Sequence, residues 1–60
     1  MLKELIKQKR LMKGLRQEDL ATLIGVSRQT IAFIEGGKDC KLKTLRKLGE
    51  VLDIPELKSL

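Results

Sequence analysis

The sequence offers few side chains of the kind that carry out covalent chemistry. It contains no histidine and one cysteine, Cys40, and it has neither a glycine-rich phosphate loop nor metal ligands at the usual spacings. Its few acidic residues fall at expected helix starts or on solvent-facing positions. We therefore expect a protein that is not an enzyme and that needs no cofactor and no metal.

Without covalent chemistry, the side chains can act by hydrogen bonding. Those best suited to hydrogen-bond base edges lie together in residues 28–30. Arg28 can bond guanine O6 and N7 as a fork, and Gln29 can do the same to adenine N6 and N7. The Thr30 hydroxyl can bond a base or a phosphate, and its methyl can contact the methyl of thymine. These side chains can act together only if the surrounding sequence presents them on one element.

A short helix followed by a tight turn is predicted just before this stretch. Leu20, Ala21 and Ile24 form an apolar stripe at helical spacing. Gly25 follows where a helix end needs a residue that accepts a positive φ. The sequence therefore predicts a helix that begins near Gln17 and ends at this glycine.

A second helix is predicted directly after the turn. Ser27 is a good N-cap, because its hydroxyl can accept a bond from a free amide of the first turn. Ile31 and Ile34 then form an inward stripe. Two helices joined by a turn that contains glycine, the second with a polar outer face, are typical of a DNA-reading helix-turn-helix. The residues left on the outer face are Arg28, Gln29, Thr30 and Phe33.

Three further helices are predicted, over residues 2–12, 42–52 and 55–60. Gly49 weakens the second of these by about 1 kcal/mol relative to alanine, but it would permit close contact with another helix. Residues 1–60 are thus predicted to be one all-α domain, a compact bundle of five short helices. The expected inward residues are Leu2, Leu5, Ile6 and Met12 in the first helix, and Leu42, Leu45, Leu48 and Leu52 in the fourth.

An ordered set of residues resembles the phage-repressor helix-turn-helix family, of the Cro/CI or XRE-like type, over nearly the whole chain. Its tail, residues 37–52, resembles the small antitoxin-type members. The segments that carry the resemblance are Gly14-Leu15-Arg16-Gln17-Glu18-Asp19-Leu20-Ala21, Ile24-Gly25-Val26-Ser27-Arg28, Thr30-Ile31 and Ile34-Glu35-Gly36.

The resemblance implies which side chains meet DNA. Base edges are expected to be contacted by Arg28, Gln29, Thr30 and Phe33. Phosphates are expected to be contacted by Arg16, Gln17, Ser27, Lys38, Lys41 and Lys43. Gln17 is also expected to brace the start of the reading helix, although it could be a plain solvent-facing residue, and each lysine could simply be solvated. Phe33 has two readings, a ring that packs on thymine methyls or a core residue.

Two departures from a standard helix end also follow from the sequence. Arg16 stands where the family usually has Thr or Ser, and an arginine has no oxygen acceptor with which to cap a helix. Glu35 places a carboxylate at a helix C-terminus, where the helix dipole disfavours it, so it needs a partner. The resemblance implies an ion pair between Glu35 and Arg10.

The charge distribution agrees with a nucleic-acid partner. The net charge is +5, which favours nucleic acid or an anionic surface. Basic residues gather in two zones, residues 1–16 and 38–47, which flank the predicted helix-turn-helix. They are suited to phosphate contacts, although lysines that merely solvate two helices would give the same pattern.

These features predict a sequence-specific double-stranded DNA-binding protein, a transcriptional repressor or autoregulator that binds a palindromic operator as a homodimer. The alternative is an antitoxin-type interaction module that binds a toxin or effector protein as well as DNA. The sequence has no apolar run long enough to cross a membrane and no visible secretory leader, and a single cysteine fits the reducing cytoplasm. Candidate dimer contacts are Leu11, Val51, Leu57 and Leu60.

Overall fold

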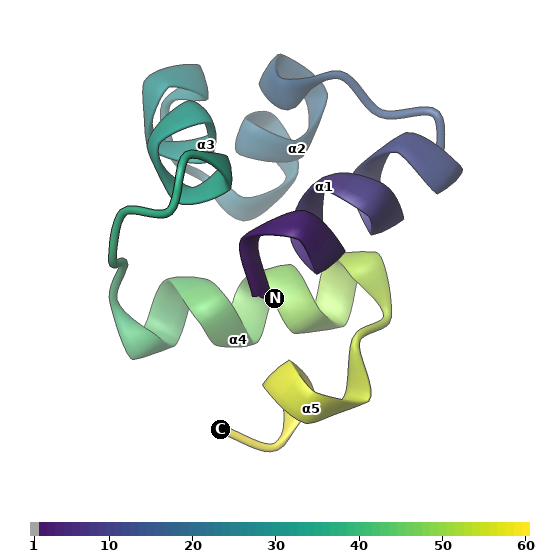
Figure 1. Cartoon of the computed structure of the whole chain (residues 1–60), viewed down its shortest axis with the longest axis vertical. Coiled ribbons are helices and arrows are strands. Elements are labelled where there is room, and N and C mark those ends of the chain that lie inside the picture. Colours follow the sequence, from purple (N-terminus) through teal and green to yellow (C-terminus); the bar gives the residue numbers. More distant parts are fainter. Residues whose placement is uncertain (1) are drawn as a thin grey trace.

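The computed structural model describes residues 2–60 and folds this part of the chain into five α-helices (Figure 1). The all-helical prediction is therefore confirmed. The helices are α1 (Leu2–Met12), α2 (Gln17–Ile24), α3 (Arg28–Glu35), α4 (Leu42–Leu52) and α5 (Pro55–Lys58).

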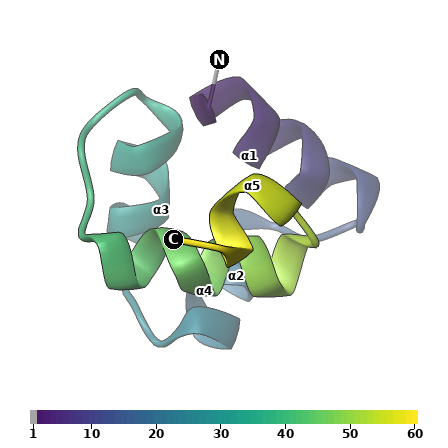
Figure 2. The same cartoon turned by 90° about the horizontal axis from the view of Figure 1, so that it is seen from below.

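α4 lies between α5 on one side and the other helices on the opposite side (Figures 1 and 2). α1 and α2 contact α4, and α2 and α1 also contact α3. α5 packs on α4 from the side opposite to α2 and α3 (Figure 1). As a result α3 keeps one long side free of other helices.

The core consists of aliphatic side chains from all five helices and from the α4–α5 connection. Its fully buried members are Ile6, Leu20, Ile31, Leu48, Leu52 and Ile54. The predicted stripes of α2 and α3 are confirmed, because Ala21, Ile24 and Ile34 are also buried. Burial of these apolar surfaces is the main force that holds short helices together.

The predicted inward stripe of α1 is wrong at both ends. Leu2 is 43% exposed and Met12 is 76% exposed. The buried residues of α1 are Ile6 and Arg10, which lie four positions apart and so share one face. A charged residue takes the inward position at the end of α1, and Met12 is turned to solvent.

The apolar residues at the two ends of the C-terminal pair of helices also differ from the prediction. Leu42 is 57% exposed, because it opens α4 before the helix reaches the core. Leu57 was a candidate dimer contact, but it is 4% exposed and packs in the core. It is therefore unavailable to a partner, whereas Leu11 and Leu60 are exposed and Val51 is partly buried.

The turn between α2 and α3 is fixed by two local features. Gly25 adopts a left-handed conformation with φ 75°, and the next amide, Val26 N–H, donates to Ala21 O at 2.9 Å. The Ser27 Oγ then accepts a bond from Thr30 N at 3.2 Å and caps α3. The turn residue and the cap are those that the sequence predicts.

Gly49 lies at a close contact between α4 and α5. A Cβ atom at Gly49 would lie 2.6 Å from Leu57 Cβ and 2.8 Å from Lys58 N. Real Cβ atoms do not approach other atoms so closely. The close helix contact that the sequence permits at this position is therefore present.

Within residues 2–60, no helix has the length and apolar character that a membrane crossing requires.

Candidate nucleic-acid interface

The outer side of α3 presents its leading polar residues to solvent. Arg28 and Gln29 are exposed, while Ile31 and Ile34 on the opposite side are buried. The spacing of 3.6 residues per turn separates the two sets, because buried positions recur at i and i+3. The side chains of Arg28 and Gln29 are thus held on a short rigid element and point away from the core.

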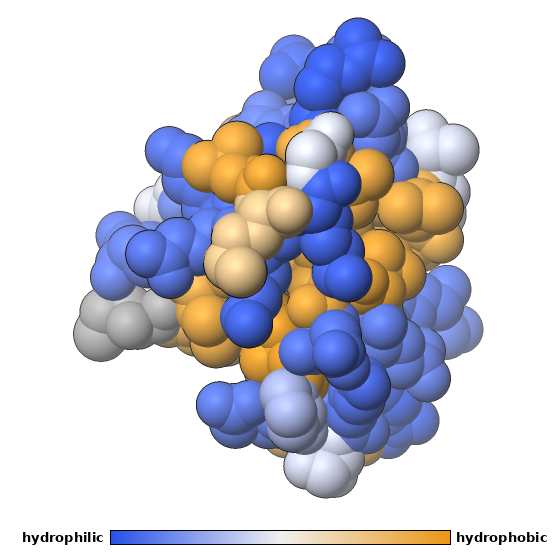
Figure 3. Space-filling model, turned by 90° about the vertical axis from the view of Figure 1, so that its right-hand side faces the viewer, coloured by the Kyte–Doolittle hydropathy of each residue, from blue (hydrophilic) through white to orange (hydrophobic). Residues whose placement is uncertain are grey.

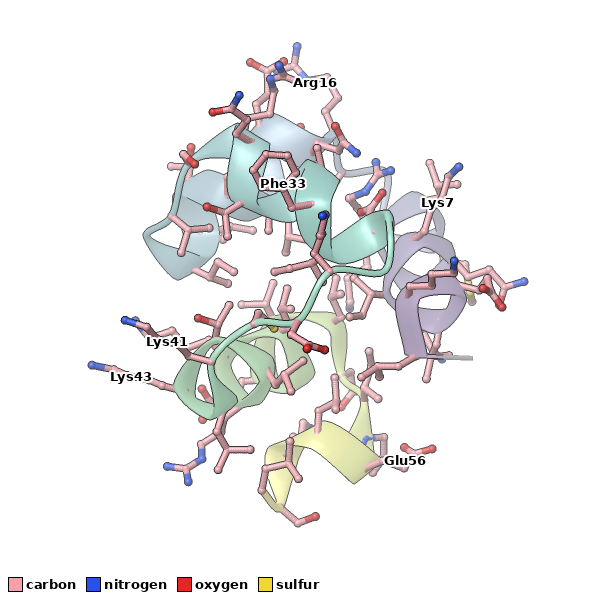
Figure 4. The ribbon with its side chains drawn as sticks, turned by 60° about the vertical axis from the view of Figure 1, so that its left-hand side comes forward. Lys7, Arg16, Phe33, Lys41, Lys43 and Glu56 are labelled. Carbon is pink, nitrogen blue, oxygen red and sulfur yellow. The ribbon has the colours of Figure 1, made fainter. Side chains whose placement is uncertain are left out.

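Phe33 belongs to the outer side of α3. Its side chain is 53% exposed, and its ring stands out from the helix (Figure 4). The inward side of α3 is already filled by Ile31 and Ile34. Of the two readings left open by the sequence, the core residue is ruled out.

The hydroxyl groups at the start of α3 bind each other. Ser27 Oγ and Thr30 Oγ1 lie 3.0 Å apart, in addition to the bond from Thr30 N to Ser27 Oγ. The Thr30 hydroxyl therefore already makes one hydrogen bond, and it keeps a further donor or acceptor site, beside its methyl, for an outside contact.

Arg16 caps α2 in an indirect way. Its side chain has no acceptor, but Asp19 Oδ2 accepts a bond from the Arg16 backbone N–H at 2.8 Å. The Arg16 guanidinium also donates to Asp19 at 3.1 and 3.2 Å, and it lies 3.3 Å from Glu18 Oε1. The bond from Arg16 holds the pKa of the Asp19 carboxyl below its usual value. Arg16 is exposed at the start of α2 (Figure 4), with its charge partly balanced by two carboxylates.

Gln17 contacts α3 at a different place from the one expected. Its Nε2 donates to Glu35 Oε1 at 3.2 Å, so it braces the end of α3 and the prediction that it braces the start is wrong. The partner is 18 residues away in sequence, and local spacing gives no sign of it. One of the two amide hydrogens of Gln17 is used in this bond.

Arg10 and Glu35 form a buried ion pair that joins α1 to α3. Arg10 Nε donates to Glu35 Oε2 at 2.7 Å, and Arg10 Nη2 donates to Glu35 Oε1 at 3.1 Å. The two side chains are only 8% and 5% exposed. Arg10 Nη1 also donates to the Leu15 carbonyl at 2.7 Å, so the same guanidinium holds the α1–α2 connection. Together with Gln17, these groups fix the end of α3 against α1 and α2.

Exposed lysines lie beside α3 on the segment that leads into α4. Lys38 is in the loop, Lys41 is the N-cap residue of α4, and Lys43 is in its first turn. Lys41 and Lys43 extend outward from the start of α4 (Figure 4). Lys38 and Lys41 also line a hollow together with Phe33. These ammonium groups can attract the phosphates of a nucleic acid whose bases face α3.

The side of the molecule where α1 ends has a different character. Figure 3 looks at this side and shows hydrophobic side chains gathered across its middle. Leu11 and Met12, at the end of α1, are 57% and 76% exposed. The polar side chains of α3 and the apolar end of α1 thus lie on different sides.

Residues 2–60 bring no three Cys, Asp or Glu side chains together in a way that could hold a metal ion.

Comparison with known proteins agrees with this architecture. A family model described as helix-turn-helix matches residues 6–58. An uncharacterized HTH-type transcriptional regulator of Methanocaldococcus jannaschii is 44% identical over 54 residues, which cover 88% of this chain and 82% of the relative. No solved structure matches the chain significantly.

Proposed function

The chain belongs to the helix-turn-helix family of the phage-repressor, XRE-like type, and on this premise we propose that it is a sequence-specific double-stranded DNA-binding regulator of transcription. The observation that carries the proposal is the outward presentation of Arg28 and Gln29 by a helix whose other side is buried. The regulatory role is supported by the description of the relative as a transcriptional regulator.

The proposed mechanism is docking. α3 enters the major groove, where Arg28 and Gln29 read base edges by paired hydrogen bonds. Thr30 and Phe33 contact the same bases through apolar groups. The register on the duplex is set by phosphate contacts, which we assign to Arg16, Gln17, Ser27, Lys38, Lys41 and Lys43.

Two of these phosphate assignments carry a condition. Gln17 uses one amide hydrogen on Glu35, so its second hydrogen is the one that would bind a phosphate. Arg16 is held by Asp19 and Glu18, so it must share its guanidinium with two carboxylates. None of the three lysines takes part in an ion pair within residues 2–60, so they are the stronger candidates.

We further propose that the protein acts as a repressor or autoregulator and binds a palindromic operator as a homodimer. The described chain measures 25 × 22 × 21 Å, and half-sites one helical turn apart are separated by about 34 Å. Two copies side by side, with their side-chain layers included, fit this separation. Leu11, Val51 and Leu60 remain the candidate contacts between the copies.

Selection of bound sequences from a random duplex pool tests the central proposal. The expected result is one enriched site with two-fold symmetry, whose half-sites lie about one helical turn apart. Enrichment of no sequence over the starting pool would contradict sequence-specific binding. The selected site would also report whether two copies bind together.

Replacing Gln29 with alanine should weaken binding by about 1–3 kcal/mol and relax the preference at one base pair per half-site. The reason is that the variant loses a paired hydrogen bond to a base edge but keeps every phosphate contact. Dissociation constants on the selected site and on single-base variants of it would measure the effect. Equal losses on the selected site and on random duplex would contradict a base-reading role for Gln29.

Replacing Lys43 with alanine should weaken binding to all duplexes alike. A lysine that neutralises one phosphate contributes about 1 to the slope of log affinity against log salt concentration. A salt titration on selected and random duplex would measure this slope for both proteins. Lys58 lies on α5, on the side of α4 opposite to α3 (Figure 1). It provides the matched control, and Lys58→Ala should leave the slope unchanged.

A protein partner, such as a toxin, is a second candidate function that the apolar end of α1 favours. Leu11 and Met12 are exposed there, on a different side from α3, so such a partner would not compete with DNA. Co-purification from the native host with the natural protein and a Met12→Glu variant tests this. A partner retained equally by both proteins would not use this surface.

A further inference from the structure

A hollow beside the outer side of α3 combines apolar and basic walls. Val26, Thr30 and Phe33 line it from the helix-turn-helix, while Lys38 and Lys41 line it from the loop that leads to α4. In Figure 4 the ring of Phe33 stands above this loop. The two hydrogen-bonding residues that lead α3, Arg28 and Gln29, do not line the hollow.

The wall formed by the helix-turn-helix is apolar. Phe33 contributes a ring that is 53% exposed, and Val26 contributes a partly buried aliphatic side chain. Thr30 also lines this wall, and its side chain carries a methyl next to the hydroxyl that is bonded to Ser27 Oγ at 3.0 Å. Phe33 is the single aromatic residue of the chain. Its exposed ring offers an apolar surface that a ligand can cover.

The opposite wall is charged. Lys38 and Lys41 are exposed ammonium groups, and the Asp39 carboxylate lies between them in sequence and lines the same hollow. A ligand that suits both walls has an apolar group next to an anionic backbone. In the major groove, the C5 methyl group is the apolar feature of a base edge, and the strand that carries it supplies the phosphates.

We infer that this hollow receives the C5 methyl group of a pyrimidine base, and that Phe33 and Thr30 form the surface that distinguishes a methylated from an unmethylated C5. The inference rests on the proposed function, and it gives two groups of residues at α3 different roles. Arg28 and Gln29 read hydrogen-bonding groups, and the hollow reads a methyl. Both thymine and 5-methylcytosine carry this group, so the protein is expected to respond to cytosine methylation at the same position.

The test uses the operator obtained by selection, with each thymine replaced in turn by deoxyuridine, which lacks only the methyl. At one position in each half-site the loss should weaken binding by about threefold to fivefold, the effect of burying one methyl group. Cytosine and 5-methylcytosine, each paired with guanine, are then compared at that position. If 5-methylcytosine is preferred over cytosine by the same factor, the hollow accepts the C5 methyl of either pyrimidine. If the two bind equally, recognition of 5-methylcytosine is overturned and the hollow is a site for thymine alone.

Variants connect the effect to the hollow. In Phe33→Ala the methyl preference should fall below about twofold, while Phe33→Leu, which keeps an apolar side chain, should retain part of it. Thr30→Ser deletes the methyl but keeps the hydroxyl bonded to Ser27, and it should also reduce the preference. Phe33 is exposed, so its variants are expected to fold, and circular dichroism would verify this.

Three outcomes separate the inference from the function on which it rests. If binding is sequence-specific but no replacement of thymine by deoxyuridine weakens it, the inference is overturned and the proposed function stands. A methyl preference that survives in Phe33→Ala also overturns it, because the methyl then contacts another part of the protein. Binding that shows no sequence preference at all overturns the proposed function and the inference together.

Discussion

Replacing Glu35 with glutamine is expected to lower the free energy of unfolding by about 3–5 kcal/mol, because it leaves Arg10 buried without its counter-charge. Arg10 is 8% exposed in its side chain and makes two bonds to the Glu35 carboxylate, at 2.7 and 3.1 Å. The amide of the variant can accept one of these bonds but carries no charge. A domain of 60 residues has a total stability of only about 3–9 kcal/mol, so the variant should be largely unfolded at physiological temperature.

Thermal unfolding followed by circular dichroism measures the loss, which should exceed about 10 °C in melting temperature. Asp53→Asn is the matched control, because it removes the same charge from the exposed pair with Lys58 and asparagine tolerates the left-handed backbone of Asp53. Its melting temperature should change little. An Arg10→Met, Glu35→Met double variant should recover much of the stability, because no charge is then left buried. A Glu35→Gln protein that melts like the natural one would contradict a stabilising role for the pair.

Gly49→Ala should destabilise the protein by about 1–3 kcal/mol, the usual cost of forcing an extra group into a packed core. Helix propensity alone predicts the opposite sign, a gain of about 1 kcal/mol. The structure decides between them, because the added Cβ would lie 2.6 Å from Leu57 Cβ and 2.8 Å from the Lys58 backbone nitrogen. A backbone atom cannot turn aside as a side chain can, so α5 must move away from α4.

Urea unfolding of Gly49→Ala and of Glu50→Ala measures this balance. Glu50 is the exposed neighbour of Gly49 in the same helix, so its replacement tests propensity without a clash and should change stability by less than about 0.5 kcal/mol. An equal or higher midpoint for Gly49→Ala would show that α5 is held loosely.

The helices can be predicted from the sequence because the residues that begin, end and bury them lie close together in the chain. Ser27 caps α3 and Gly25 ends α2, and both stand beside apolar stripes of clear helical period. The outward position of Arg28 and Gln29 follows from the same period. Local signals therefore predict which side chains α3 presents.

The differences from prediction arise where contacts join distant parts of the chain. Arg10 is buried on the inward side of α1, where Glu35, 25 residues away, pairs with it, whereas Met12 faces solvent. Gln17 donates a hydrogen bond to Glu35 at the end of α3, which is also far from it in the sequence. The side of Phe33 is also undecided in the sequence, since an apolar residue at that spacing fits either the core or a surface, and only the packing of Ile31 and Ile34 settles it.

The residues that anchor α3 and those proposed to read DNA are different sets. Ile31, Ile34 and Glu35 hold the helix in place, whereas Arg28, Gln29 and Phe33 lie outside the core. Under the proposed function, point substitutions among the second set change the DNA sequence that is bound at little cost to folding. On the same proposal, duplicated copies of such a gene are free to diverge in the DNA sites they bind while remaining equally stable as proteins.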